Sequence, residues 1–121
     1  MIVEDETDLI DILQIWIEEI GFKTQTSENG FDALNKINRQ KPDLVLLDIS
    51  LPQLNGFEVL KKLRSNPETA HIPVIILTAN CDLETKKNAL ALKADGFMTK
   101  PVEASDLSKM IQKFITPSGN S

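Results

Sequence analysis

Two uninterrupted apolar runs limit what this chain can fold into more than any other feature of its sequence. They are Leu44 to Leu47 and Val74 to Leu77, and each follows a turn that contains a proline, Pro42 or Pro73. A strand with one solvent-facing side alternates apolar and polar residues, whereas a strand covered on both faces is apolar throughout. The runs therefore predict two strands in the middle of a parallel sheet with helices on both faces.

Shorter strand candidates and helical patterns alternate along the rest of the chain. The further strands are expected at Ile2-Val3, Phe22 to Thr26 and Phe97 to Thr99, and the helices at Glu6 to Ile20, Gly30 to Arg39, Asn55 to Arg64, Leu83 to Leu92 and Ser105 to Ile115. The first helix carries one apolar stripe, formed by Leu9, Leu13, Trp16, Ile17 and Ile20, and Gly21 follows it as a C-terminal cap would. Because strands and helices alternate, the expected fold is a three-layer α/β sandwich with right-handed crossovers.

The length and charge of the chain exclude several classes of protein. With 121 residues it has the size of one domain, and its single cysteine, Cys81, excludes an internal disulfide. A net charge of −5 argues against direct binding of nucleic acid, which usually needs a basic surface. No apolar stretch reaches the roughly 20 residues that span a bilayer and no signal-peptide pattern is present, so we expect a cytoplasmic protein without membrane insertion.

The two ends of the chain differ from its body. Residues 117–121 are polar and rich in turn formers, so we expect one domain over residues 1–116 followed by a polar tail or the start of a linker. Only Met1 to Val3 precede the acidic pair Glu4-Asp5, which is short for a central strand. The sequence leaves open whether the domain stands alone or was cut from a longer protein.

Polar side chains follow four of the expected strands at the point where each strand ends. Glu4 and Asp5 follow the first strand, Asp48 the third, Thr78 the fourth and Lys100 the fifth. The carboxyl ends of parallel strands meet at one edge of the sheet, where such folds bind ligands, so these side chains should lie together. Any one of them has a plainer explanation, since Asp and Thr often begin turns and caps, but four coincidences are hard to explain that way.

Three carboxylates at one point, those of Glu4, Asp5 and Asp48, require a cation. At about 5 Å and an effective dielectric constant near 20, two ionised carboxylates repel each other by roughly 3 kcal/mol. Oxygen ligands without His or Cys favour a hard ion, and a site that also takes up a phosphate favours Mg²⁺. Lys100 adds a positive charge that can pair with Asp48 and then with a phosphoryl oxygen.

These residues, with their spacing, resemble the receiver domains of two-component response regulators. The matching order is Glu4-Asp5, then Asp48-Ile49-Ser50-Leu51-Pro52-Gln53-Leu54-Asn55-Gly56, then Thr78-Ala79, then Lys100-Pro101, within a resemblance that runs from Ile2 to about Ile115. The resemblance implies a flavodoxin-like fold, with a five-stranded parallel sheet in order 2-1-3-4-5 flanked by five helices. It also implies a phosphoacceptor in a His-to-Asp phosphorelay, which assists its own phosphorylation and dephosphorylation and is not a metabolic enzyme.

The resemblance implies a role for each matching residue. Asp48 would be the nucleophile that takes the phosphoryl group, Asp5 would bind Mg²⁺ directly, Glu4 would bind it mainly through water, and Ser50 through its backbone carbonyl. The Thr78 hydroxyl would hydrogen-bond a phosphoryl oxygen and Lys100 would offset the negative charge. Catalysis would then consist mostly of placement and charge neutralisation.

Three further expectations come from the same resemblance. Phe97 would follow Thr78 inward as a switch residue after phosphorylation. Ser50 and Asn80 would set the lifetime of the phosphorylated form. The Lys100–Pro101 peptide bond would be cis.

Two protein-binding surfaces are also expected. A sensor histidine kinase or histidine phosphotransfer protein would dock near the first helix, where Ile10, Ile12 and Ile15 lie outside the core stripe. An output partner or effector domain would bind the face formed by the fourth helix, fifth strand and fifth helix. This region carries lysines that a merely solvated face would also explain, namely Lys86, Lys87, Lys93, Lys109 and Lys113.

Two other functions compete with this one. A phosphatase of the haloacid dehalogenase type also uses an aspartate nucleophile with Mg²⁺, but it expects a second aspartate where this chain has Ser50. A receiver-like module that binds partners without being phosphorylated is the other alternative. Nucleotide-binding phosphate loops and dinucleotide-binding folds are excluded because their glycine motifs are missing from the sequence.

Overall fold

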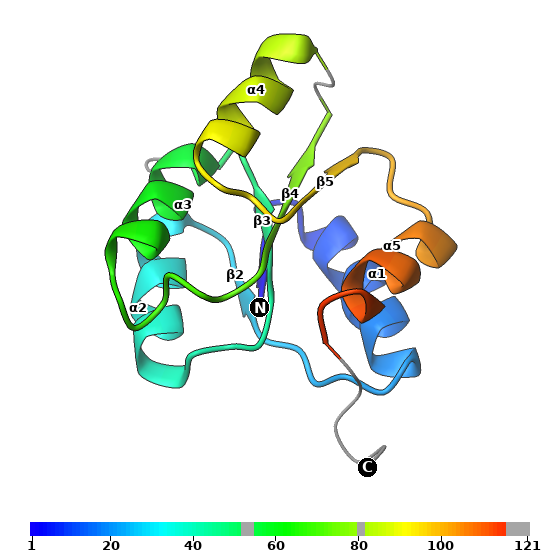
Figure 1. Ribbon diagram of the computed structural model, residues 1–121. Coiled ribbons are helices and arrows are strands. Elements are labelled where there is room, and N and C mark those ends of the chain that lie inside the picture. The colour runs from blue at the N-terminus through cyan, green and yellow to red at the C-terminus, as the bar shows by residue number, and fades with distance from the viewer. Residues whose placement is uncertain (52–54, 80–81, 116–121) are drawn as a thin grey trace.

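A five-stranded parallel sheet forms the centre of the molecule (Figure 1). The computed structural model describes residues 1–51, 55–79 and 82–115. Its strands are β1 (Ile2–Val3), β2 (Thr26–Ser27), β3 (Val45–Asp48), β4 (Val74–Thr78) and β5 (Gly96–Thr99). They lie in the order β2-β1-β3-β4-β5, which confirms the predicted topology. Every residue of β3 and β4 is buried, as the two apolar runs predicted.

Five helices cover the two faces of this sheet (Figure 1). The helices α2 (Gly30–Gln40), α3 (Gly56–Ser65) and α4 (Leu83–Ala91) lie on one side, and α1 (Thr7–Glu19) and α5 (Ala104–Gln112) on the other. Alternate residues of a strand point to opposite faces, so Leu47 and Ile76 join the core beneath α2 and α3, whereas Leu46 and Ile75 join the core beneath α1 and α5. The structure is therefore the predicted three-layer sandwich.

The C-terminus of α1 ends at a glycine, as predicted. Gly21 has a φ of 100°, a left-handed conformation that costs glycine little. Its N–H donates to the carbonyl of Glu18 at 3.1 Å, and the N–H of Phe22 donates to the carbonyl of Ile17 at 3.3 Å. This pair of bonds is a Schellman motif, and Phe22 and Ile17 accordingly contact the same apolar core.

Three helices begin at a side-chain cap that satisfies a backbone N–H of the first turn. The capping residues are Asn29 of α2, Asn55 of α3 and Asp82 of α4. Asn55 matters most for the site, because it begins α3 directly after the segment that follows β3. Within the part of the chain that the structure describes, no helix is long and apolar enough to cross a membrane.

Two predictions about the elements were wrong. The second strand was expected over Phe22 to Thr26 but comprises Thr26–Ser27, because Phe22 packs into the α1–α5 core and Thr26 pairs with Ile2 of β1. Ile10 was expected on the outer side of α1 but is 6% exposed, so Ile12 and Ile15 alone form the exposed apolar part of that group. The remaining elements lie close to their predicted ranges, although α5 ends at Gln112 instead of Ile115.

Candidate functional site

The C-terminal ends of β3, β4 and β5 are joined by backbone hydrogen bonds that continue beyond the paired strands. Asp48, the last residue of β3, stands opposite Leu77, and Thr78, the last residue of β4, stands opposite Thr99. The N–H of Ile49 donates to the carbonyl of Leu77 at 3.3 Å, and the N–H of Lys100 donates to the carbonyl of Thr78 at 2.8 Å. The sheet therefore brings Asp48, Thr78 and Lys100 together, as predicted.

Asp48 is a buried carboxylate with both oxygens oriented by neighbours. The residue is only 2% exposed, so solvent hardly reaches its side chain. The backbone N–H of Ser50 donates to Oδ1 at 2.9 Å, and Nζ of Lys100 donates to Oδ2 at 3.3 Å. The first bond is made within the segment that follows β3, so the local chain path sets the orientation of the carboxylate.

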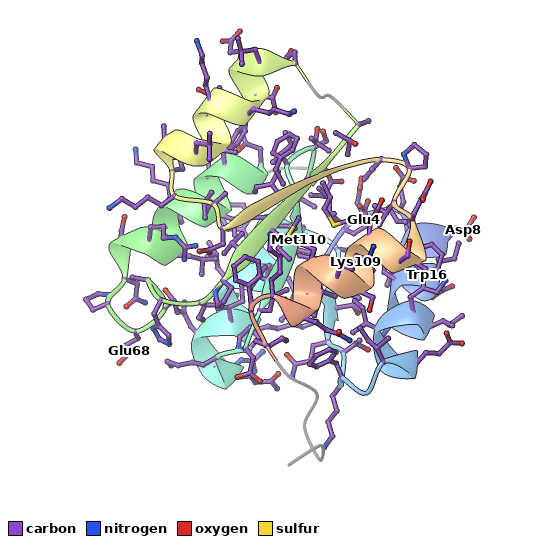
Figure 2. The ribbon with its side chains drawn as sticks, turned by 45° about the vertical axis from the view of Figure 1, so that its right-hand side comes forward. Glu4, Asp8, Trp16, Glu68, Lys109 and Met110 are labelled. Carbon is purple, nitrogen blue, oxygen red and sulfur yellow. The ribbon has the colours of Figure 1, made fainter. Side chains whose placement is uncertain are left out.

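Two more carboxylates stand beside Asp48 at the end of β1. One side-chain oxygen from each of Glu4, Asp5 and Asp48 lies within 4.8 Å of the others. Glu4, labelled in Figure 2, is fully buried, whereas Asp5 is exposed. The predicted acidic cluster is therefore present, with one side chain open to solvent.

Glu4 combines complete burial with incomplete hydrogen bonding. Its Oε2 accepts from the backbone N–H groups of Asp5 and Glu6, each at 3.1 Å. Its Oε1 lies 2.9 Å from Nζ of Lys100, but no residue in the described ranges makes a hydrogen bond of good geometry to it. Lys100 therefore pairs with Glu4 by charge, and the ammonium is shared between this oxygen and Asp48.

Burial and neighbouring charges shift the pKa values of Glu4 and Lys100. Burial raises the pKa of Glu4 to about 7, and the charge of Asp48 adds to the increase, whereas the Lys100 ammonium and the Glu6 N–H oppose it. Burial alone would lower the pKa of Lys100, but its contacts with Glu4 and Asp48 outweigh this effect and the pKa is raised. Lys100 is therefore held as a cation between acids that it does not fully neutralise.

Glu6 is a neighbour of the site that sequence reasoning missed. Its Oε1 lies 3.8 Å from Nζ of Lys100, which thus contacts three carboxylates. The signal in the sequence was the run of three consecutive acids, Glu4-Asp5-Glu6, of which only two matched the expected motif. Donor atoms with this chemistry, oxygen ligands in acidic surroundings, fit a hard divalent cation.

The two residues predicted to form the switch, Thr78 and Phe97, lie on the neighbouring strands β4 and β5. Thr78 is 1% exposed, and Phe97 is half-buried on the edge strand β5, where it pairs with Ile76. Nζ of Lys86 on α4 lies 5.8 Å from the centroid of the Phe97 ring. The Lys100–Pro101 bond is cis, as predicted. Asn80, which was predicted to help set the lifetime of the phosphorylated form, lies outside the described residues.

Comparison with known proteins gives one consistent family. Residues 1–112 match the family model of the response regulator receiver domain. The chain is 35% identical over 115 residues to the alkaline phosphatase synthesis transcriptional regulatory protein PhoP of Bacillus subtilis, covering 95% of this chain and 47% of that protein. It thus spans about half the length of this relative.

Solved structures of similar proteins agree with this match. Chemotaxis protein CheY4 of Vibrio cholerae has a TM-score of 0.89 at 25% identity, covering 94% of this chain and 95% of that one. The receiver domain of a sensor histidine kinase from Pseudomonas aeruginosa, solved with a magnesium ion coordinated in its active site cleft, has a TM-score of 0.86 at 25% identity and covers 93% of each chain. With its fold, its acidic edge and these relatives in agreement, the chain belongs to the response regulator receiver domain family.

Proposed function

We propose that this receiver accepts a phosphoryl group on Asp48 from a phosphohistidine of a sensor histidine kinase or histidine phosphotransfer protein. One carboxylate oxygen of Asp48 attacks phosphorus, the phosphorus–nitrogen bond breaks, and its electron pair stays on the imidazole. The observation that carries the proposal is the buried Asp48 carboxylate, held by the Ser50 N–H and Lys100 beside Asp5. Phosphoryl transfer depends mainly on such placement and charge neutralisation.

We propose Mg²⁺ as the cofactor of this step. Asp5 and Asp48 would bind it directly, Glu4 mainly through water, and Ser50 through its backbone carbonyl. The clustered carboxylate oxygens and the complete burial of Glu4 support this assignment, as does the magnesium ion in the related Pseudomonas aeruginosa receiver. When bound, Mg²⁺ supplies positive charge that offsets the charge of the incoming phosphoryl oxygens.

We assign five residues to the phosphorylated state. The Thr78 hydroxyl would donate a hydrogen bond to one phosphoryl oxygen, and Lys100 would pair with another. Phe97 would turn inward after Thr78 moves, which changes the α4–β5–α5 face offered to an output partner or effector domain. Side chains at Ser50 and Asn80 would set how long the phosphoryl group survives hydrolysis.

The phosphodonor would dock on the outer face of α1. Ile12 is 43% exposed and Ile15 is 56% exposed on this helix, which begins directly after the acidic cluster. Two exposed isoleucines one turn apart give a donor helix an apolar contact beside the site. We expect protein partners in the cytoplasm and, because the chain carries a net charge of −5, no direct contact with nucleic acid.

Intact-protein mass spectrometry with acetyl phosphate tests the phosphoacceptor role. Wild-type protein incubated with Mg²⁺ and acetyl phosphate should gain the mass of one phosphoryl group, and hydroxylamine should remove it. Asp48→Ala should gain nothing. A wild type that stays unmodified, or an equal gain in Asp48→Ala, would overturn the proposal and favour a receiver-like module that binds partners without phosphorylation.

The α1 docking surface has a separate test. Replacing Ile12 and Ile15 with serine should lower the rate of phosphotransfer from a phosphorylated donor protein and leave the rate with acetyl phosphate unchanged. Leu90→Ser is the matched control, since Leu90 is 72% exposed on α4. Equal rates for all three proteins with the protein donor would remove α1 as the docking surface.

The family match argues against one of the two competing functions and leaves the other open. Family membership argues against a phosphatase of the haloacid dehalogenase type, because the chain matches receivers over residues 1–112. Receivers act as signalling phosphoacceptors and are not enzymes in the ordinary sense. The other alternative is a module that binds partners without being phosphorylated. The acetyl phosphate experiment distinguishes it from a phosphoacceptor.

A further inference from the structure

The helix α4 is held unevenly along its length. Its buried residues are Thr85 and Ala89, two small side chains that contribute little apolar area. Leu83 and Leu90, which are seven positions apart and so share a face of the helix, are 66% and 72% exposed. Figure 1 shows α4 at the top of the view, beyond α3 on the same side of the sheet. The position of α4 therefore depends strongly on contacts made by a few individual side chains.

The C-terminal end of α4 is fixed by one arginine. Arg64, at the end of α3, has a side chain that is 14% exposed. Its guanidinium donates to the carbonyl oxygens of Lys93, Ala70 and Ile72 and to the carboxylate of Asp95, at 2.7 to 3.1 Å. Asp95 Oδ2 also accepts from the N–H of Val74 at 2.9 Å. These bonds tie the segment after α4 to the starts of β4 and β5.

The middle of α4 contacts the proposed switch residue. Nζ of Lys86 lies 5.8 Å from the centroid of the Phe97 ring, a distance at which an ammonium ion is attracted to the electron-rich face of the ring. Lys86 is exposed, and Phe97 is the one aromatic ring near its ammonium among the described residues. The contact joins α4 to β5 at the side chain that the phosphorylation switch would move.

We propose that Lys86 is a latch that holds the resting position of α4 through the ring of Phe97, with Arg64 fixing the C-terminal end of the helix. This inference rests on the proposed function, because it requires Phe97 to turn inward when Asp48 is phosphorylated. The ring then leaves Lys86, the contact is lost, and α4 is released along its N-terminal part while Arg64 still holds its C-terminal end. Lys86 thus biases the domain toward the unphosphorylated state.

Methyl NMR of the leucines on α4 tests the latch. The methyl shifts of Leu83, in the N-terminal part of α4, and of Leu90, near the end that Arg64 holds, are recorded before and after phosphorylation with acetyl phosphate and Mg²⁺. The change at Leu83 defines the two end states, and Leu90 should change less. In unphosphorylated Lys86→Met, which keeps the length of the side chain but removes its charge, the population ratio of the active-like state should rise about two- to fivefold. The shifts then move toward their phosphorylated positions.

Three matched variants separate the latch from general effects of charge. Lys87→Met removes the same charge from an exposed neighbour to which no described ring is close, and it should keep the wild-type shifts. Lys86→Arg retains a cation over the ring and should also keep them. In a Phe97→Leu background, Lys86→Met should produce no additional change, because the ring is already absent.

The outcomes separate failure of the latch from failure of the phosphoacceptor role. If wild-type protein is phosphorylated and its leucine shifts change, but Lys86→Met behaves as Lys87→Met does, the latch is wrong and the proposed function stands. An equal effect of Lys86→Met with and without the Phe97 ring also overturns the latch. If Asp48 is never phosphorylated, the proposed function and the latch fail together.

Discussion

Lys100 provides the positive charge that allows the carboxylates of Glu4 and Asp48 to be buried at one edge of the sheet. Its ammonium lies 2.9 Å from Glu4, 3.3 Å from Asp48 and 3.8 Å from Glu6. Burial raises the pKa of Glu4 to about 7, and the charge of Asp48 adds to the increase. One positive charge cannot neutralise the three carboxylates that Lys100 contacts. The resting site is thus short of positive charge, which Mg²⁺ would provide.

Gly56 occupies a position beside the site where no larger side chain fits. A Cβ at this position would lie 2.5 Å from the carbonyl oxygen of Asp48 and 2.6 Å from Cα of Ile49, so the start of α3 presses directly on the phosphoacceptor's backbone. We predict that Gly56→Ala lowers the free energy of unfolding by roughly 1–3 kcal/mol. It should also slow phosphorylation by acetyl phosphate, since Asp48 must shift.

Gly96→Ala is the control for this prediction. A Cβ at Gly96 would meet Sδ of Met110 at 3.0 Å, and Figure 2 shows Met110 between α5 and the sheet. A methionine end can move more easily than backbone, so Gly96→Ala should cost less stability than Gly56→Ala in urea unfolding. Equal losses in both variants, with unchanged phosphorylation in Gly56→Ala, would contradict the close approach of α3 to Asp48.

At the scale of elements, α1 and α4 end in the same motif with different residues. Lys93 after α4 occupies the position that Gly21 holds after α1, with a φ of 65°. Its N–H donates to the carbonyl of Leu90, and the N–H of Ala94 donates to the carbonyl of Ala89, each at 3.0 Å. A lysine in this left-handed conformation carries steric strain that a glycine avoids.

We therefore predict that Lys93→Gly stabilises the domain. The free energy of unfolding should rise by up to about 1 kcal/mol, because the strain is relieved while the backbone carbonyl that Arg64 binds is kept. Lys87→Gly, in the interior of the same helix, should lower it by about 1 kcal/mol. Urea unfolding of both variants checks this, and a loss of stability in Lys93→Gly would contradict the assigned strain.

The start of α2 gives a pH-dependent prediction. The hydroxyl of Ser27 and the ammonium of Lys36 lower the pKa of Asp32, whose Oδ2 lies 2.8 Å and 3.1 Å from them. A lowered pKa in the folded state means that ionised Asp32 stabilises the fold above its ordinary pKa, and that this gain is lost as the pH falls through the folded-state value. The stability difference between wild type and Asp32→Asn should therefore shrink on acidification.

Urea unfolding at about pH 6 and about pH 2 measures this difference before and after acidification. Asp11→Asn is the control, because Asp11 is exposed on α1 and has no ion pair among the described residues. This variant controls for the loss of one exposed carboxylate. A stability difference for Asp32→Asn that stays constant between the two pH values would contradict the assigned contacts.

At the scale of the whole molecule, Mg²⁺ binding should be visible as stability. A ligand that binds only the folded state stabilises it by about 2.7 kcal/mol at a free concentration of 100 times its Kd. Thermal unfolding of the wild type should shift upward with Mg²⁺ and return on chelation. Asp5→Asn should lose most of this shift and Asp11→Asn should keep it; an equal shift in Asp5→Asn would remove Asp5 as a ligand.

Much of the architecture could be predicted because parallel strands obey simple rules. The apolar runs located β3 and β4, and the polar residues after each strand indicated one shared edge, where the structure brings Asp48, Thr78 and Lys100 together. The acidic cluster of Glu4, Asp5 and Asp48 followed from the same rule.

What could not be predicted depends on how particular side chains pack. The position of β2 depends on the burial of Phe22, and the burial of Ile10 on the rotation of α1 against the sheet. The hydrogen bonds of Arg64 join residues that are far apart in the sequence and follow no periodic pattern. The same is true of Lys86 over Phe97, where two ordinary surface positions meet only in the folded molecule.

Locating the phosphoryl group on one residue tests the central claim most directly. Protein treated with acetyl phosphate, with and without Mg²⁺, would be reduced with borohydride, which converts an aspartyl phosphate to homoserine, and then digested for peptide mass spectrometry. We predict homoserine at Asp48 in the sample with Mg²⁺ and little or none without it. Homoserine at another acidic residue, or none in either sample, would contradict the assignment of Asp48 as the phosphoacceptor.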